Sequence, residues 1–305
     1  MSDNIKSGII IKGLSGLYEV RLDGGGSVLC PARGLFRHEG ETVAAGDRCA
    51  LTMSPDGSGS ITEILPRRNL LMRPPIANLD TLFIVIAAAK PAPSPFTVDK
   101  LTCIAVHNDI TPKIVINKKE LDPERAESLA GIYRSVGFET FLTSCESGEG
   151  MKELSECVAS LGEGSICAFA GASGVGKSTL LGVLFPDMEF ATGEISRKNQ
   201  RGRHTTRHVE LYDTGRAYVA DTPGFTLLDF TRYDFFDLDD LPFTFPEFAE
   251  HLENPGCRYT RCTHKTEEGC AVVDALNRGL IPLRRHESYC ALWEELKEKR
   301  DREYD

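Results

Sequence analysis

Several features that would place a protein in a membrane or outside the cell are missing from this sequence. No apolar run approaches the roughly 18 residues that a membrane-spanning helix needs. The chain starts Met1-Ser2-Asp3-Asn4, without the basic end and apolar stretch of a secretion signal. Its 10 cysteines are spread widely, unlike those of a small disulfide-stapled secreted domain. We therefore expect a cytoplasmic protein with no membrane contact.

An excess of positive charge is also missing, because 35 Lys and Arg face 45 Asp and Glu, a formal net charge of −10. This balance argues against indiscriminate nucleic-acid binding, although such binding follows local charge. Residues 197–207 depart from the balance, since they hold only basic charges: Arg197, Lys198, Arg201, Arg203 and Arg207. A solvated basic loop and a loop that contacts RNA both fit this segment.

Residues 1–67 contain five short apolar runs separated by glycine-rich turn signals. The runs span 9–11, 17–22, 28–30, 49–53 and 61–65. This spacing predicts five strands in a small antiparallel barrel. An oligonucleotide-binding-type (OB-type) barrel and a plain structural barrel both satisfy the pattern.

Beyond residue 80 the apolar runs become continuous, which is typical of strands buried on both faces. They span 82–88, 114–116, 141–142, 166–170 and 218–220, with segments of helical length between several of them. We therefore predict an α/β domain with a mostly parallel sheet over 68–228. Residues 229–305, with a cysteine cluster and an amphipathic helix around Trp293, predict a separate α-helical module.

The segment after the run 166–170 matches the P-loop pattern in every defining position. Its residues are Gly171, Ala172, Ser173, Gly174, Val175, Gly176, Lys177, Ser178 and Thr179. Glycines let backbone N–H groups point at phosphate oxygens, and the N-terminus of a following helix adds its positive dipole end. Lys177 is predicted to reach the β- and γ-phosphates, and Ser178 to ligate Mg²⁺.

Two further segments complete the phosphate side. Asp221-Thr222-Pro223-Gly224 follows the run 218–220, so Asp221 is predicted to hold Mg²⁺ through water and the Gly224 N–H to face the γ-phosphate. Gly202-Arg203-His204-Thr205-Thr206 lies between the P-loop and Asp221, where a first switch belongs. Thr205 or Thr206, with Thr206 slightly favoured, would complete the Mg²⁺ shell when the γ-phosphate is present.

A base-reading element precedes the P-loop. Asn117-Lys118-Lys119-Glu120 resembles the guanine-specificity motif Asn-Lys-x-Asp, with glutamate in the place of aspartate, although an exposed turn also fits it. A carboxylate there accepts two hydrogen bonds from guanine, each worth roughly 1.5–3 kcal/mol. Ser144-Cys145 fits the weaker Ser-Ala element that contacts the guanine O6. Because these motifs come before the P-loop, the order is circularly permuted, which a domain with adjacent termini tolerates.

One expected catalytic group is missing. Phe225 follows Asp221-Thr222-Pro223-Gly224, where many GTPases carry the glutamine that orients the attacking water. Phenylalanine cannot hydrogen-bond water, so another group must position the nucleophile. His204 is the nearest candidate, with a surface histidine as the alternative interpretation.

The cysteine cluster has the composition of a metal site. Cys257, Cys262, His264 and Cys270 lie within fourteen residues. Three thiolates and one imidazole suit a single tetrahedral Zn²⁺, and four protein ligands leave no open catalytic position. We predict a structural zinc ion; unpaired core cysteines or a disulfide are the alternatives.

With these motifs the sequence resembles the ribosome small-subunit-dependent GTPase A family (RsgA, also YjeQ) over nearly its whole length. The marks are Asn117-Lys118 ahead of the P-loop, the segments 202–206 and 221–225, and the cysteine–histidine set. Residues 284–289 also resemble that family's tail. Glu120 departs from the family's pattern and bears on the stringency of guanine selection.

The resemblance implies a cytoplasmic GTPase that binds GTP and GDP, and we expect it to be a monomer. It implies that the protein binds the small ribosomal subunit and its rRNA late in assembly, and that the subunit stimulates slow hydrolysis. The barrel and the zinc module would contact rRNA, and the basic segment 197–207 would link that contact to the nucleotide state. Two rivals remain: an RNA-binding scaffold with structural nucleotide, and a permuted GTPase that serves the large subunit or a membrane.

Overall fold

The computed structural model describes residues 5–14, 16–32, 42–72, 74–188, 190, 209–221, 230, 233–253 and 256–304. The chain divides into two compact units, each assembled from segments far apart in the sequence. The first unit comprises 1–82, 156–169 and 178–225, and the second comprises 83–155, 170–177 and 226–305. Among the described residues, no helix combines the length and apolar character required to cross a bilayer. The domain boundaries at 67 and 228 stay predictions.

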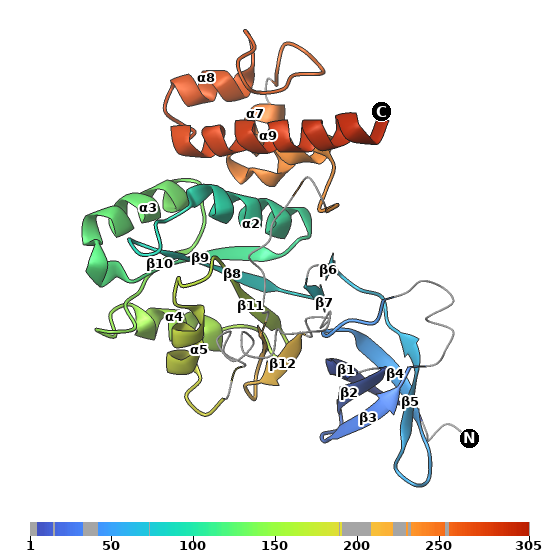
Figure 1. Cartoon of the computed structure of the whole chain (residues 1–305). Helices are drawn as coiled ribbons and strands as arrows, with labels where there is room; N and C mark the ends of the chain where they lie inside the picture. The colour runs from blue at the N-terminus through green and yellow to red at the C-terminus, as the bar shows by residue number, and fades with distance from the viewer. Residues whose placement is uncertain are drawn as a thin grey trace. The chain divides into compact units, whose positions relative to one another are not determined.

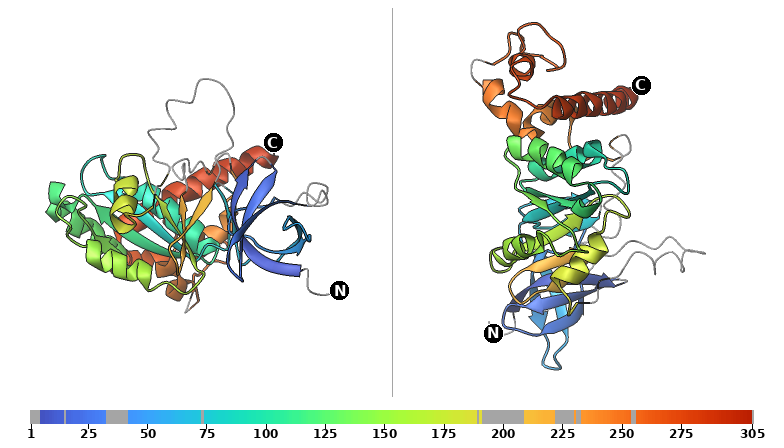
Figure 2. Two further views of the ribbon diagram at one scale, coloured as in Figure 1. Left: turned by 90° about the horizontal axis from the view of Figure 1, so that it is seen from below. Right: turned by 90° about the vertical axis from the view of Figure 1, so that its left-hand side faces the viewer.

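Five antiparallel strands in the first unit form the predicted barrel (Figures 1 and 2). They are β1 (Ile5–Leu14), β2 (Leu17–Leu22), β3 (Ser27–Pro31), β4 (Arg48–Met53) and β5 (Gly59–Ile64). Strand β1 pairs with β2 and β4, β2 pairs with β3, and β4 pairs with β5. A parallel bridge from Ala32 to Ile61 joins the end of β3 to β5. The strand order β1-β2-β3-β5-β4 therefore closes into a five-stranded OB-type barrel.

The barrel core forms because alternate residues of each strand point inward. Its fully buried members come from all five strands: Ile10, Val20, Cys30, Cys49, Leu51 and Ile61. Cys30 and Cys49 pack there as small apolar side chains, and burial raises the pKa of the Cys49 thiol to about 12. These two cysteines are packing residues of the barrel core.

The first unit also contains β11 (Ile166–Ala170), β12 (Glu210–Asp213), β13 (Tyr218–Asp221), most of α5 (Lys177–Leu184) and a hairpin of β6 (Leu70–Met72) and β7 (Pro75–Ala77). Strand β13 runs parallel to β11 and antiparallel to β12. Strand β12, which the apolar runs did not predict, pairs with β1 opposite Lys12. The barrel is thus joined edge to edge to part of the α/β sheet.

The second unit contains the remaining strands, in the order β10 (Thr140–Leu142), β9 (Thr111–Asn117) and β8 (Thr81–Ala87). Strands β9 and β10 are parallel, and α2 (Pro95–His107) and α3 (Pro123–Ser135) pack on them. The 3₁₀ turn η1 (Lys119–Leu121) follows β9, and α4 (Met151–Ala159) begins beyond β10. All seven residues of β8 are buried, as its continuous apolar run predicted.

The C-terminal module of the second unit consists of short helices and one long one. They are η2 (Leu238–Thr244), η3 (Pro246–Phe248), α7 (Ala249–Glu253), α8 (Ala271–Asn277) and α9 (Leu283–Tyr304). Helix α9 contains the predicted amphipathic segment, with Leu292 and Leu296 buried. It packs against α2 and η2 (Figures 1 and 2).

Candidate functional site

The glycine-rich loop between β11 and α5 has a backbone shape that only glycine accepts at two positions. Gly171 and Gly176 have φ angles of 142° and 99°. A Cβ on Gly171 would lie 2.2 Å from the carbonyl oxygen of Val85, and one on Gly176 would lie 2.3 Å from Nδ2 of Asn117. The pattern recognised in the sequence is therefore required by close backbone approach as well as by φ.

Lys177, the first residue of α5, folds back over this loop. Its Nζ donates hydrogen bonds to the carbonyl oxygens of Gly171 at 2.7 Å and Ala172 at 2.9 Å. Burial lowers the pKa of the Lys177 ammonium, because a low-dielectric surrounding disfavours its charge. An anionic ligand in the loop would favour the charged form. Ser178 and Thr179 follow in the first turn of α5, and both are exposed.

Asn117, at the end of β9, ties the second motif to the P-loop. Its side chain is buried, and Nδ2 donates to the carbonyl oxygen of Val175 at 3.0 Å. Its Oδ1 accepts hydrogen bonds from the Thr143 hydroxyl at 3.1 Å and the Cys145 thiol at 3.8 Å. Thr143 fixes which end of the amide faces the P-loop. Sequence reasoning missed Thr143, although it directly precedes Ser144-Cys145.

Lys118 provides a second tie. Its backbone is left-handed, with a φ of 60°, which aims the side chain back toward the loop. Nζ donates to the carbonyl oxygens of Lys90 and Gly174, both at 2.7 Å. Asn117 and Lys118 therefore hold two consecutive P-loop carbonyls. Motifs that are far apart in the sequence form one continuous structure here.

The segments 119–120 and 144–149 lie next to each other beyond the ends of β9 and β10. The Lys119 backbone N–H donates to the carbonyl oxygen of Thr143 at 3.1 Å, and its ammonium pairs with Glu149 at 2.5 Å. Ser144 is buried, and its hydroxyl accepts a hydrogen bond from the backbone of Ser147 at 3.1 Å. Ser144 thus shapes its own turn, while Cys145 stays half-buried beside Asn117.

Glu120, the residue that replaces the usual aspartate, lies on η1 with its side chain exposed. Its charge reaches the neighbouring segment: burial first, and then the Glu120 carboxylate, raise the pKa of the Cys145 thiol, while a hydrogen bond to Asn117 lowers it. The net direction keeps the thiol protonated, so it can donate to Asn117. The base-reading candidates Asn117, Lys118, Glu120 and Cys145 are therefore neighbours.

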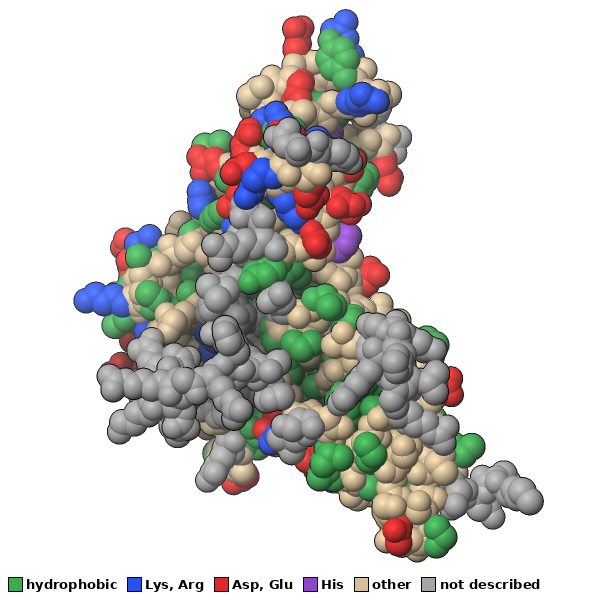
Figure 3. All heavy atoms as spheres, turned by 45° about the vertical axis from the view of Figure 1, so that its right-hand side comes forward, with side chains coloured by type: hydrophobic (Ala, Val, Ile, Leu, Met, Phe, Trp, Pro, Cys, Tyr) green, Lys and Arg blue, Asp and Glu red, His purple; other side chains and the backbone are tan. Residues whose placement is uncertain are grey.

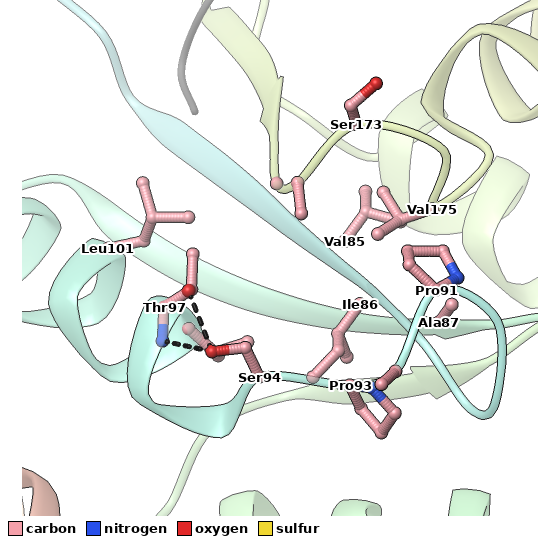
Figure 4. A pocket seen from close by; sticks show the side chains of 14 residues that line it. Val85, Ile86, Ala87, Pro91, Pro93, Ser94, Thr97, Leu101, Ser173 and Val175 are labelled. Atoms are coloured by element: carbon pink, nitrogen blue, oxygen red, sulfur yellow. Dashed lines mark hydrogen bonds between the residues drawn. The ribbon is translucent and has the colours of Figure 1, made fainter. Parts of the chain in front are cut away.

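A cavity of about 80 Å³ lies beside the P-loop (Figure 4). Its walls are mostly apolar and come from the end of β8, the residues 91–94, the first turns of α2, and the P-loop residues 171–173 and 175. Ser94 caps α2, since its hydroxyl accepts a hydrogen bond from the Thr97 N–H at 3.4 Å. The cavity is too small for a nucleotide, and it lies between the P-loop and α2.

Asp221 ends β13, which runs parallel to β11 with Ala220 opposite Ala168. Because the carboxyl ends of parallel strands meet at one edge of a sheet, the Asp221 backbone lies at the same edge as the carboxyl end of β11. The predicted switch residues His204, Thr205 and Thr206, and Gly224 with Phe225, lie outside the described residues. Of the predicted nucleotide site, the described residues therefore include the P-loop, the base-reading segments and the Asp221 backbone.

The four predicted metal ligands come together in the C-terminal module. Their ligand atoms all lie within 4.8 Å of one another. The Cys257 and Cys270 sulfurs are 3.8 Å apart, and the His264 Nδ1 is 3.4 Å from the first and 3.6 Å from the second. A tetrahedral Zn²⁺ with bonds of about 2.3 Å to sulfur and 2.0 Å to nitrogen needs separations of about 3.8 and 3.5 Å. The donor set therefore fits such an ion, and its sulfurs are too far apart for a disulfide.

Surrounding residues fix the shape of this cluster. The backbone of His264 is left-handed, with a φ of 57°, and its carbonyl oxygen lies 2.8 Å from Nε2 of His286. The Tyr289 hydroxyl donates to the carbonyl oxygen of Thr263 at 2.9 Å. The Glu267 carboxylate accepts from the backbone N–H groups of residues 263, 265 and 266. Side chains of α9 and of the loop itself therefore fix the conformation of the loop that carries the ligands.

Comparisons with known proteins agree with this architecture. A family model described as RsgA GTPase matches residues 64–231, and one described as RsgA N-terminal domain matches residues 7–61. A curated protein of Caldanaerobacter subterraneus subsp. tengcongensis, named small ribosomal subunit biogenesis GTPase RsgA, is 41% identical over 300 residues, which cover 97% of this chain and 98% of that protein. A relative of the same name from Geobacillus thermodenitrificans is 41% identical over 299 residues, 97% and 99% of the two chains.

Solved structures give the same result. The crystal structure of YjeQ from Thermotoga maritima matches with a TM-score of 0.81 and 32% identity, covering 96% of this chain and 98% of that one. YloQ, described as a circularly permuted GTPase, matches with a TM-score of 0.78 and 32% identity, covering 97% and 96%. The predicted fold class, a permuted P-loop GTPase domain with an N-terminal barrel, is confirmed. The chain belongs to the RsgA family of circularly permuted GTPases.

Proposed function

We propose that this protein hydrolyses GTP to GDP and phosphate, and that it uses this reaction in late maturation of the small ribosomal subunit in the cytoplasm. The observation that carries the proposal is the tie from Asn117 to the P-loop carbonyl of Val175, with Thr143 holding the amide. It joins the base-reading segment to the phosphate-binding segment despite their inverted order. The names of the curated relatives support the link to the small subunit.

The proposed roles of the site residues follow the chemistry of phosphoryl transfer, in which positioning and charge provide most of the catalysis. Backbone N–H groups of 171–179 hold the phosphates, and Lys177 supplies a positive charge. Ser178, Asp221 and Thr205 or Thr206 would hold the Mg²⁺ that is bound with GTP, and this ion would neutralise charge on the phosphate oxygens. Gly224 faces the γ-phosphate. The base is read by Asn117, Lys118, Lys119, Glu120, Ser144 and Cys145.

Hydrolysis by the isolated chain is expected to be slow, because Phe225 cannot orient water. We propose that the bound subunit orders the segment that contains His204, which then positions the attacking water or supports the threonines beside it. The barrel and the C-terminal module contact rRNA in this proposal, and residues 197–207 add basic charge. A monomer is sufficient for these roles.

We also propose that Cys257, Cys262, His264 and Cys270 bind one structural zinc ion. Their separations support this, and four protein ligands leave no position for substrate. The ion would hold the loop 257–270 against α9, so that the module presents a fixed surface to its partner.

One assay tests the proposal: phosphate release from GTP, with ATP as the control, measured with and without purified small subunits. We expect a slow basal rate, strong stimulation by small subunits and little hydrolysis of ATP. Pelleting with each subunit identifies the partner. Bound nucleotide without phosphate release would favour a scaffold, and stimulation by large subunits alone would favour the other rival.

A further inference from the structure

Helix α2 forms a wall beside the P-loop. Its first turns contribute Thr97, Val98 and Leu101 to the cavity whose opposite wall includes P-loop residues 171–173 (Figure 4). Because protein interiors are densely packed, a shift of this helix changes the contacts of the loop. Whatever holds α2 therefore bears on the geometry of the nucleotide site.

The C-terminal module holds α2 through a buried charged network. The Arg285 side chain of α9 is fully buried, and its Nη1 donates to Asp99 Oδ1 of α2 at 2.6 Å and to the Thr102 hydroxyl at 3.2 Å. Its Nε and Nη2 donate to the two oxygens of Glu247 at 2.7 and 3.2 Å. Removing one partner of such a buried pair leaves an uncompensated buried charge, so this network ties α9 to α2.

A second contact joins the same two helices one residue further along α2. The Lys100 ammonium lies 2.6 Å from Oε2 of Glu295, and above the rings of Phe96 and Phe230 at 4.6 and 5.4 Å. Phe230 is fully buried, and its ring centroid is 4.9 Å from that of Phe235. Phe230 therefore packs against Lys100 of α2 and Phe235 of the same module.

The far end of α2 is also covered by the module. The ring of His107 packs 5.2 Å from that of Phe236. Two acidic residues of the segment 234–240 form ion pairs with α9: Asp234 pairs with Lys299, and Asp239 pairs with Arg300. Figure 3 shows basic and acidic side chains side by side on this module. The module therefore contacts α2 along most of its length, while the first turn of α2 faces the P-loop.

We propose that the C-terminal module positions the nucleotide site for hydrolysis through helix α2, with Arg285 and the Lys100–Glu295 pair as positioning residues. This inference rests on the proposed function, since it supplies a route by which a subunit bound to the module alters the P-loop surroundings. Packed helices move as units, so a displacement of α9 is passed to the first turn of α2. Arg285, Lys100 and Glu295 are not among the residues that line the cavity beside the P-loop.

The milder test uses Glu295→Gln, with Glu298→Gln as the matched control. Both remove one charge from α9, but Glu298 pairs with Arg302 on its own helix. In full-length protein we expect Glu295→Gln and Lys100→Met each to lower the subunit-stimulated kcat roughly tenfold, about 1.4 kcal/mol. The KM for GTP and subunit pelleting should not change, and the double variant should be no worse than either single one.

Arg285→Lys provides the second arm, because it keeps the charge but loses the planar fork, whereas Arg284→Lys alters an exposed neighbour. Arg285→Lys should lower the stimulated kcat at temperatures well below its Tm, and Arg284→Lys should not. A merely structural role would lower Tm without this split between kcat and KM. Full stimulation in Glu295→Gln and Arg285→Lys would overturn the positioning role alone, and a native protein without stimulation would overturn the proposed function with it.

Discussion

The P-loop and the metal cluster are both candidate ligand sites, but different parts of the chain give them their shape. The P-loop is shaped by backbone, with glycines at positive φ and carbonyl groups already bound by Asn117, Lys118 and Lys177. The metal cluster is shaped by four side chains that converge within 4.8 Å. The first site has protein partners for its carbonyl groups, whereas the thiols of the second lie against one another. The nucleotide site should therefore keep its shape without ligand, and the module should depend on its ion.

The largest effect should come from removing the metal. Cys262→Ser leaves three ligands, and structural zinc in small domains contributes about 10–16 kcal/mol to folding. We expect metal analysis to find one zinc ion in the native chain and none in the variant, with the C-terminal module unfolded while GTP binding persists. Cys290→Ser, in the same module but outside the ligand set, is the control. A native protein that contains no metal and keeps its fold would refute the site.

Lys177→Ala should have the next largest effect, because Lys177 is the only cation of the segment 171–179. Loss of a group that stabilises transition-state charge lowers kcat by roughly 10²–10³-fold. Phosphate release should fall to that extent and nucleotide binding should weaken, while Lys152→Ala on α4 should behave as the native protein. Hydrolysis at the native rate would mean that 171–179 is not the phosphate site.

His204→Ala tests the missing glutamine. The variant should bind GTP and the small subunit normally but lose roughly 10²-fold of the stimulated rate, the usual contribution of a positioned proton-transfer group. Stimulated phosphate release is the measurement, and His251→Ala on α7 is the control. Equal stimulation in His204→Ala and native protein would leave the catalytic group to the ribosome.

Thr143→Val should produce the smallest effect, and it tests whether the Thr143 hydroxyl helps to hold the P-loop through Asn117. It removes the hydroxyl that orients the Asn117 amide, a hydrogen bond worth about 1 kcal/mol. GDP affinity should weaken about fivefold by titration with a fluorescent analogue. Thr140→Val, in the strand β10 that directly precedes Thr143, should not change it, because the Thr140 hydroxyl donates to the Phe138 carbonyl. Unchanged affinity in Thr143→Val would show that Asn117 holds its orientation without this hydroxyl.

Much of the fold could be predicted because its signals are local. Each of the five barrel strands, and each of the strands β8 to β11 and β13, coincides with an apolar run bounded by turn residues. The short hairpin of β6 and β7 was missed, and so was β12, since Glu210 and Asp213 leave only two apolar residues between them. Its pairing with β1 is supported by Lys12–Glu210 at 2.7 Å and Arg21–Asp213 at 2.9 Å, ion pairs that link distant parts of the chain.

The sequence by itself determined the chemistry of this protein: the P-loop, the inverted order of its motifs and the four metal ligands depend on residue type and spacing. Only the tertiary structure decided what holds those groups. Thr143 orients Asn117, the carbonyl oxygen of Lys90 receives Lys118, and Arg285 joins α9 to Asp99 of α2. Such partners are common residues or backbone atoms. Their roles cannot be read from residue type, and they become visible only in the folded structure, where each buried polar group needs a hydrogen-bond partner.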